Sequence, residues 1–162
     1  MPTTILVSAC LLGIHCRYDG AAKPDLRVKD FLIRKELIPI PVCPEQLGGL
    51  PTPRTPCRFA EGSGKEVITG NAEVFSRDGC RLTETFLVGA KETLEIARQC
   101  GCRLALLKER SPSCGVRQCY RGDHLLAGMG VTTALLAERG ITVFSEEELD
   151  ELEWCLQGSR FT

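Results

Sequence analysis

The chain has 162 residues, of which 20 are basic and 21 acidic, and its formal net charge is −1. This length suits one domain with a proper hydrophobic core. The balanced charge argues against strong electrostatic attraction to nucleic acid or to an anionic membrane surface, and no apolar run is long enough to span a bilayer. We therefore expect a cytoplasmic protein.

Apolar runs and turn residues predict alternating strands and helices along the chain. We expect strands over residues 5–8, 38–43, 104–107 and 141–144, and helices over residues 26–37, 86–100, 131–139 and 146–156. Two prolines in the second strand indicate a sheet edge or a bulge. Thr83 or Thr85 is expected to cap the second helix, Gly101 to end it, and Ser145 to cap the last one.

Two stretches fall outside this alternation. Residues 66–68 and 72–75 are expected to pair as a small hairpin, and the Pro- and Gly-rich loop over residues 44–56 is long enough to suggest a function. The whole pattern predicts an α/β fold with one domain over residues 1–162. Its mostly parallel sheet is flanked by helices in a Rossmann-like, doubly wound arrangement, with a small irregular or hairpin insertion.

Ten cysteines are many for a chain of this length. In a secreted protein they would indicate a disulfide framework. The first twenty residues, however, have no basic segment and only a short apolar run, so we interpret them as a first core strand and not as a signal peptide. Metal binding or thiol chemistry is therefore the better interpretation, with some cysteines packed as small hydrophobic residues.

Three cysteines each follow a strand-like run, namely Cys10 in TILVSACLLG, Cys43 in IPIPVCPEQLGG and Cys114 in LALLKERSPSCG. Because parallel strands end at one edge of a sheet and ligands bind in the crevice there, we expect these thiols to meet. Adjacent glycines favour close approach of backbone amides to a bulky anionic group. Three thiolates leave one coordination position open, which suits catalytic zinc or an iron–sulfur cluster. Any single one of them has packing in the core as its alternative role.

The other cysteines fit no standard metal motif. Two local C-x-x-C pairs, the usual sign of a structural zinc site, are missing. Cys16, six residues beyond Cys10, is the rival ligand. We expect structural or incidental roles for Cys57, Cys80, Cys100, Cys102, Cys119 and Cys155.

Further polar residues flank these motifs. We expect Arg17, Asp19 and Arg54 to shape the mouth of a pocket. The amides of Gly128-Met-Gly130, which precede a helix, present an anion site or a plain tight turn.

The motifs SACLLG with CRYDG, PVCPEQLGGLPTPR, LLKERSPSCG and GMGVTTALL follow one another over nearly the whole chain. Together they resemble the 2-thiouracil desulfurase family. The resemblance implies an oxygen-independent iron–sulfur enzyme that converts 2-thiouracil, or a similar thiolated pyrimidine, to uracil and hydrogen sulfide without net electron transfer. It also implies a 4Fe–4S cluster held by Cys10, Cys43 and Cys114, with one open iron that takes sulfur. Cys57 departs from the family pattern.

The resemblance maps catalytic roles onto Glu45, Ser111 and Ser113. We expect Glu45 to act as general acid and base for an attacking water, its alternative role being an interaction with a helix dipole. The serines are expected to hydrogen-bond cluster sulfide, substrate or water, or else to form an ordinary turn around Pro112.

Two other functions remain open on the sequence, a zinc-thiolate hydrolase and a cluster or sulfur carrier without turnover of its own. The sequence does not distinguish a free thiolated base from a nucleoside. The lack of a basic stripe weighs against thiolated tRNA, and the oligomeric state is not indicated.

Overall fold

The computed structural model describes residues 2–158, so the first residue and the last four of the predicted domain lie outside the described structure. The strands in this range are β1 (Thr3–Ser8), β2 (Leu37–Val42), β3 (Cys57–Phe59), β4 (Val74–Ser76), β5 (Leu104–Leu107), β6 (Gln118–Arg121), β7 (His124–Ala127) and β8 (Thr142–Ser145). The helices are a 3₁₀ turn η1 (Ala9–Leu12), α1 (Leu26–Arg34), α2 (Pro44–Leu47), α3 (Gly64–Ile68), α4 (Thr83–Gln99), α5 (Val131–Glu138) and α6 (Leu149–Gly158).

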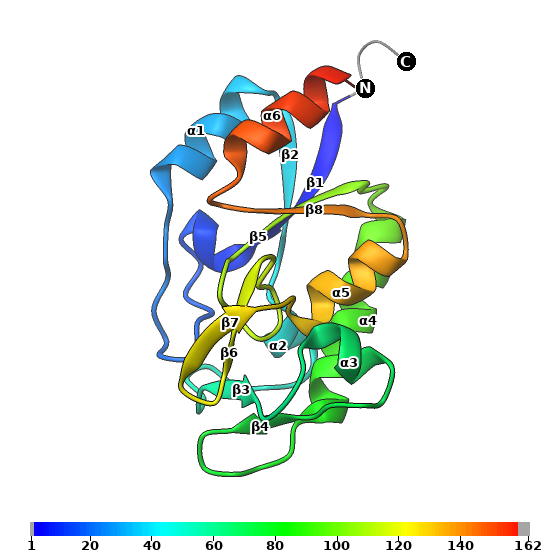
Figure 1. Cartoon of the computed structure of the whole chain (residues 1–162). Coiled ribbons are helices and arrows are strands. Elements are labelled where there is room, and N and C mark those ends of the chain that lie inside the picture. The colour runs from blue at the N-terminus through cyan, green and yellow to red at the C-terminus, as the bar shows by residue number, and fades with distance from the viewer. Residues whose placement is uncertain (1, 159–162) are drawn as a thin grey trace.

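The first sheet contains four parallel strands in the order β2-β1-β5-β8. Its central strand β1 is apolar on both faces, as expected for a parallel sheet covered on both sides. Ile5 and Val7 pack with Phe31 of α1 and Leu152 of α6, whereas Leu6 packs on the opposite face with the core under α4 and α5. Figure 1 shows α1 and α6 together over one face and α4 and α5 over the other. The predicted doubly wound α/β fold is confirmed.

The strand order places a switch point beside β1. The chain passes from β1 outward to β2, then returns to β5 on the other side of β1. In open α/β sheets, ligands bind outside the carboxyl ends of the strands at such a point. The segments that leave β1, β2 and β5 therefore share the position that this fold favours for a site.

A second, mixed sheet has the order β4-β3-β6-β7, with β3 and β6 parallel and the two outer pairs antiparallel. In Figure 1 it lies below the carboxyl ends of β1 and β2. The small irregular or hairpin insertion expected from the sequence is present as this four-stranded sheet. Within residues 2–158, no helix has both the length and the apolar character that crossing a bilayer requires.

The prediction of a hairpin over residues 66–75 was wrong. Residues Gly64–Ile68 form helix α3, because the Ser63 side chain and the Glu66 side chain make a capping box. This S-x-x-E pattern is a sequence signature of a helix start. Val74, predicted to pair with residues 66–68, pairs instead with Phe59 of β3.

Three helix boundaries also differ from the prediction. The first helix ends at Arg34, since Glu36 turns the chain with a φ of 53°. Helix α4 begins at Thr83, whose hydroxyl accepts a hydrogen bond from Val74 N instead of capping. The last helix begins three residues late, at Leu149. Strand β2, which contains Pro39 and Pro41, lies at the sheet edge as predicted.

Candidate functional site

A cavity of about 670 Å³ opens where the two sheets meet. Its wall contains Cys10 after β1, Cys43 after β2 and Cys114 after β5. The predicted convergence of the three thiols on one cavity is therefore present. Glu45, Ser111 and Ser113 line the same cavity.

Cys10 lies in the 3₁₀ turn that follows β1 and is buried. Gly13 ends this turn with a φ of 93°, a left-handed conformation that favours glycine. The Gly13 N–H donates to the Cys10 carbonyl at 3.2 Å. The turn thus fixes the backbone of Cys10 at the carboxyl end of the central strand.

Cys43 is the N-cap residue of the short helix α2, and Pro44 and Glu45 form its first turn. This helix packs against α4 with backbone in contact with backbone. A Cβ on Gly89 of α4 would lie 2.0 Å from Pro44 O, and one on Gly48 would lie 2.3 Å from Thr85 O. Glycine at both positions therefore lets α2 sit close enough to α4 to hold Cys43 and Glu45 at the cavity.

Cys16 lies beside two of the other thiols. Its thiol hydrogen-bonds both Cys10 and Cys43, and its carbonyl accepts from Cys43 Sγ at 3.7 Å. The bond to Cys16 lowers the pKa of Cys10 and raises that of Cys43, while burial raises the pKa of Cys114 to about 12. Four thiols thus gather at this end of the sheet.

The thiol set offers the donors that an iron–sulfur cluster uses. The thiols of Cys10, Cys43 and Cys114 follow three different strands and line one cavity of about 670 Å³. Thiolates are soft ligands and are the usual donors to iron–sulfur clusters. The residues present therefore fit such a cluster.

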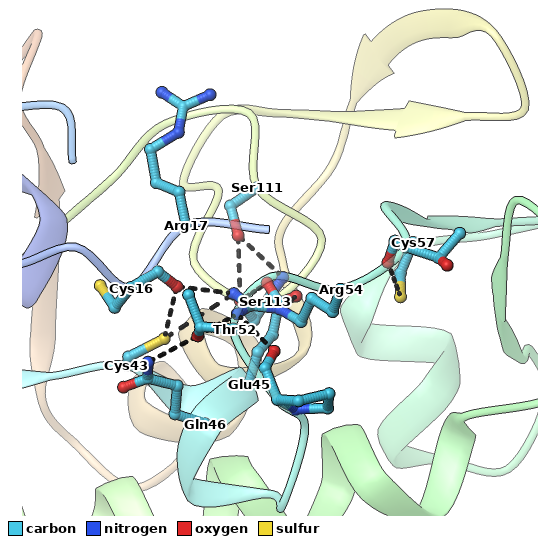
Figure 2. A network of polar contacts seen from close by, with 12 residues as sticks. Cys16, Arg17, Cys43, Glu45, Gln46, Thr52, Arg54, Cys57, Ser111 and Ser113 are labelled. Carbon is cyan, nitrogen blue, oxygen red and sulfur yellow. Dashed lines mark hydrogen bonds and ion pairs between the residues drawn. The ribbon is translucent and has the colours of Figure 1, made fainter. Parts of the chain in front are cut away.

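Glu45 is held between two donors, as Figure 2 shows. Arg54 Nε donates to one carboxylate oxygen at 3.0 Å, and Ser113 Oγ donates to the other at 3.0 Å. Both side chains of the ion pair are largely removed from solvent, with exposures of 12% for Glu45 and 6% for Arg54. Buried carboxylates need such partners.

Arg54 was predicted at the pocket mouth, and it lies instead inside the wall. Its guanidinium also donates to the carbonyls of Cys16 at 3.0 Å and Pro51 at 3.3 Å, and approaches Cys43 Sγ at 3.9 Å. The fork shape of arginine suits such simultaneous contacts. Arg54 thus connects the predicted catalytic carboxylate to two of the gathered cysteines.

The two serines have different hydrogen bonds. Ser113 Oγ donates to Glu45 and lies 3.6 Å from Cys114 Sγ. Ser111 Oγ accepts from the backbone N–H groups of Ser113 and Cys114, each at 3.2 Å, and lies 2.9 Å from Ser113 Oγ. Ser113 therefore faces the carboxylate, while Ser111 braces the turn around Pro112.

We call residues 110–118 the serine loop. The N-terminus of α5 donates to its carbonyls, from Val131 N to Pro112 O and from Thr132 N to Ser113 O, both at 2.9 Å. A Cβ on Gly130 would lie 2.4 Å from the carbonyl carbon of Ser113. The amides of Val131 and Thr132, which follow the GMG motif, thus donate to this loop and are not free to bind an anion. The anion-site alternative was therefore wrong.

Three cavity residues were not assigned this place from the sequence. Lys108 and Glu109 line the cavity directly before the serine loop. The signal that the sequence offered for this position was a charged pair at the end of a strand. Cys57, expected to be structural or incidental, also lies in the cavity wall, with its thiol 3.6 Å from Thr55 O. Arg17, predicted at the pocket mouth, lines the cavity and pairs with Asp19 at 3.6 Å.

Comparisons with known proteins agree on one relationship. The chain is 39% identical over 151 residues to YbbK, an uncharacterised protein of Bacillus subtilis (strain 168), covering 91% of this chain and 99% of that protein. A solved structure described as the [4Fe-4S]-dependent thiouracil desulfidase TudS superposes with a TM-score of 0.81 at 41% identity, covering 96% of this chain and 98% of the other. The family model for 2-thiouracil desulfurase matches residues 5–148. The chain therefore belongs to the 2-thiouracil desulfurase family.

Proposed function

We propose that this protein removes sulfur from 2-thiouracil or a similar thiolated pyrimidine, with a 4Fe–4S cluster held by Cys10, Cys43 and Cys114. The observation that carries the proposal is that these thiols, from three different strand ends, line one cavity together with Glu45 and Ser113. Family membership and the similarity to a [4Fe-4S]-dependent thiouracil desulfidase support it. Free thiols in such number suit the cytoplasm, where we place the enzyme.

The cavity fits the reaction's chemical needs. When bound, the cluster supplies an open iron that acts as a Lewis acid toward the soft sulfur of the thiocarbonyl. The protein must then deliver a water molecule to C2 of the ring and manage its protons. The overall reaction, thiouracil plus water giving uracil and hydrogen sulfide, balances without an electron donor or acceptor.

Glu45 is the residue that we assign to the proton transfers. Its oxygens accept from Arg54 and Ser113, which is how a carboxylate behaves, and each oxygen keeps a further lone pair. Glu45 takes a proton from the attacking water and later returns one to the departing sulfur, as a general base and then a general acid. Arg54 holds the carboxylate in place through both steps.

Ser113 orients the other carboxylate oxygen. Its hydroxyl lies within hydrogen-bond reach of Glu45, Ser111 and the thiol of Cys114. When Glu45 gains a proton, the Ser113 hydroxyl can turn to accept a hydrogen bond from the protonated carboxyl, because a hydroxyl both donates and accepts hydrogen bonds. Ser113 thus supports the carboxylate in both protonation states, and Ser111 keeps Ser113 in reach.

The test is an anaerobic reconstitution followed by an assay for uracil and sulfide. We expect many turnovers per cluster without a partner protein. Fewer than one sulfide released per cluster would instead identify a carrier, and zinc with no acid-labile sulfide in active protein would identify a hydrolase. Glu45→Gln keeps the shape of the side chain and should lower kcat by about 100-fold or more at unchanged iron per chain. Full activity of that variant would remove Glu45 from the mechanism.

A further inference from the structure

Glu109 is a buried carboxylate that the reaction proposed above does not use. It is 2% exposed and directly precedes the serine loop. Its Oε1 accepts hydrogen bonds from the backbone N–H groups of Val116 at 2.8 Å, Arg117 at 3.0 Å, Gln118 at 3.2 Å and Arg110 at 3.2 Å. One oxygen thus collects donors from both ends of the loop.

This convergence sets the path of the loop. Residues 116–118 must fold back onto the side chain of Glu109 to reach the same oxygen as the Arg110 N–H, which closes the intervening chain into a ring. Burial opposes the charge on Glu109, but the four backbone donors outweigh it and lower the pKa of this carboxyl. A carboxylate that accepts several backbone N–H bonds stays charged in this way.

Glu109 is itself anchored. Its backbone N–H donates to Glu146 Oε2 at 2.7 Å, and Lys108 Nζ donates to Glu146 Oε1 at 2.7 Å. Glu146 is buried and lies just beyond β8, so the end of that strand supports Glu109. The second oxygen of Glu109 has no hydrogen-bond partner among the described residues, so the hydrogen bonds that the side chain accepts all come from the serine loop.

The opposite side of the serine loop is held by α5. The N–H groups at the two ends of the loop point to Glu109, whereas its carbonyls at Pro112, Ser113 and Cys114 accept from the first turn of that helix. Ser113 lies between these two supports and reaches Glu45 at 3.0 Å. A small displacement of the loop would therefore break the hydrogen bond between Ser113 and Glu45.

We propose that Glu109 is a positioning residue, which curls the serine loop so that Ser113 and Cys114 face Glu45 across the cavity. The catalytic consequence rests on the function proposed above, but the conformational part does not. Misplacement of a reacting group by about 1 Å can cost about 100-fold in rate. The Glu109 carboxylate therefore acts on the reaction through the loop, without contact with the substrate.

Three substitutions separate geometry from charge. Glu109→Gln keeps an oxygen at the Oε1 position, Glu109→Asp keeps the charge but withdraws it by one methylene, and Glu109→Ala removes the acceptor. We expect kcat per cluster to fall about threefold for Gln and about 30- to 100-fold for Asp and Ala, with KM within about threefold of the parent in each case. Amide hydrogen exchange at residues 116–118 should accelerate in Asp and Ala, in the full chain with or without cluster.

Two matched variants control for folding and for surface charge. Thr4→Ala removes a hydrogen bond to the Cys100 carbonyl at the amino-terminal end of β1, whereas the serine loop follows the carboxyl end of β5. This variant should lower Tm without accelerating exchange at residues 116–118. Glu147→Gln removes an exposed partner of the Arg110 side chain and should leave kcat within twofold.

Unchanged exchange at residues 116–118 in Glu109→Ala would overturn the proposal, as would a kcat loss in Glu109→Asp no larger than that in Thr4→Ala. Because exchange requires neither substrate nor cluster, failure of the proposed desulfuration leaves this result readable.

Discussion

Two segments meet at the hydrogen bond between Ser113 and Glu45, and they are built in different ways. The segment over residues 43–54 depends on a side chain, since Arg54 holds Glu45 and the carbonyl of Cys16. The serine loop depends on its backbone, whose N–H groups bond to Glu109 and whose carbonyls bond to α5. The first arrangement is lost when a side chain is shortened. The second is held on the α5 side by close backbone contacts, so it is lost when a methyl group is added at Gly130.

The largest effect is expected from a methyl group on the α5 side of the serine loop. In Gly130→Ala the new Cβ would lie 2.4 Å from Ser113 C and 2.7 Å from Cys114 N, both backbone atoms. We expect a loss of about 3 kcal/mol in stability, a fall of about 6 to 12 °C in Tm and no measurable turnover. Thermal melting, iron per chain and the uracil assay measure these. Gly158→Ala, with open space around its Cβ, is the control, and a Gly130→Ala protein with parental Tm would refute the tight contact.

The second largest effect is expected from a change in residues 43–54, the segment that depends on the Arg54 side chain. Arg54→Lys keeps the charge but loses the fork that reaches Glu45, Thr52 and Cys16 together. We expect kcat to fall by about 30- to 100-fold, with a loss of about 1 to 2 kcal/mol in stability as buried acceptors lose their donors. Arg81→Lys, in an exposed pair with Glu73, should change neither. Parental kcat in Arg54→Lys would mean that Glu45 needs only a nearby charge.

A smaller effect separates the two serines. Ser113→Ala removes the donor to Glu45 and should lower kcat by about 10-fold while Tm stays within about 2 °C. Ser111→Ala leaves two backbone N–H groups without their acceptor, so it should cost about 1 kcal/mol of stability and change kcat by less than about threefold. Paired melting and kinetic curves decide this. The reverse pattern would exchange the roles that the geometry assigns to Ser111 and Ser113.

The smallest effect is on acid stability. The pKa of Glu109 is lower in the folded chain than in the unfolded one, so its stabilisation is present above the unfolded pKa of about 4.3 and is lost as pH falls through the folded pKa. In Glu109→Gln this part of the acid dependence disappears, so stability should fall less steeply below about pH 4.3. Urea unfolding of the parent protein and of Glu109→Gln at several pH values measures how steeply the unfolding free energy of each falls with pH. Identical slopes would argue against a charged Glu109 in the native loop.

Much of the fold was readable from local pattern. Buried apolar runs indicated β1, β2, β5 and β8, and the cysteines at three strand ends indicated where the cavity lies. These features depend on residues close together in the sequence and on the general rule for ligands in parallel sheets. The Ser63-x-x-Glu66 signature of α3 was also present in the sequence, but the Gly70 turn made a hairpin the preferred interpretation.

The rest depended on pairings that local pattern does not contain. The second sheet joins β3 to β6, whose Phe59 and Arg121 are far apart in the sequence, and its strands are three or four residues long. Arg54 was predicted only to shape the pocket mouth, and its ion pair with Glu45 depends on a loop that folds back on itself. The role of Glu109 likewise depends on the return of residues 116–118 to its side chain.

The two prolines of β2 have a consequence beyond strand geometry. Pro39 and Pro41 are two residues apart, so the nitrogen atoms that they leave without a hydrogen point to one side of the strand. Since β1 already pairs along the other side, the outer rim of the sheet lacks donors there, and an incoming chain finds little to pair with. The strand that delivers Cys43 is thereby protected against aggregation by strand addition, even in molecules that have not yet acquired a cofactor.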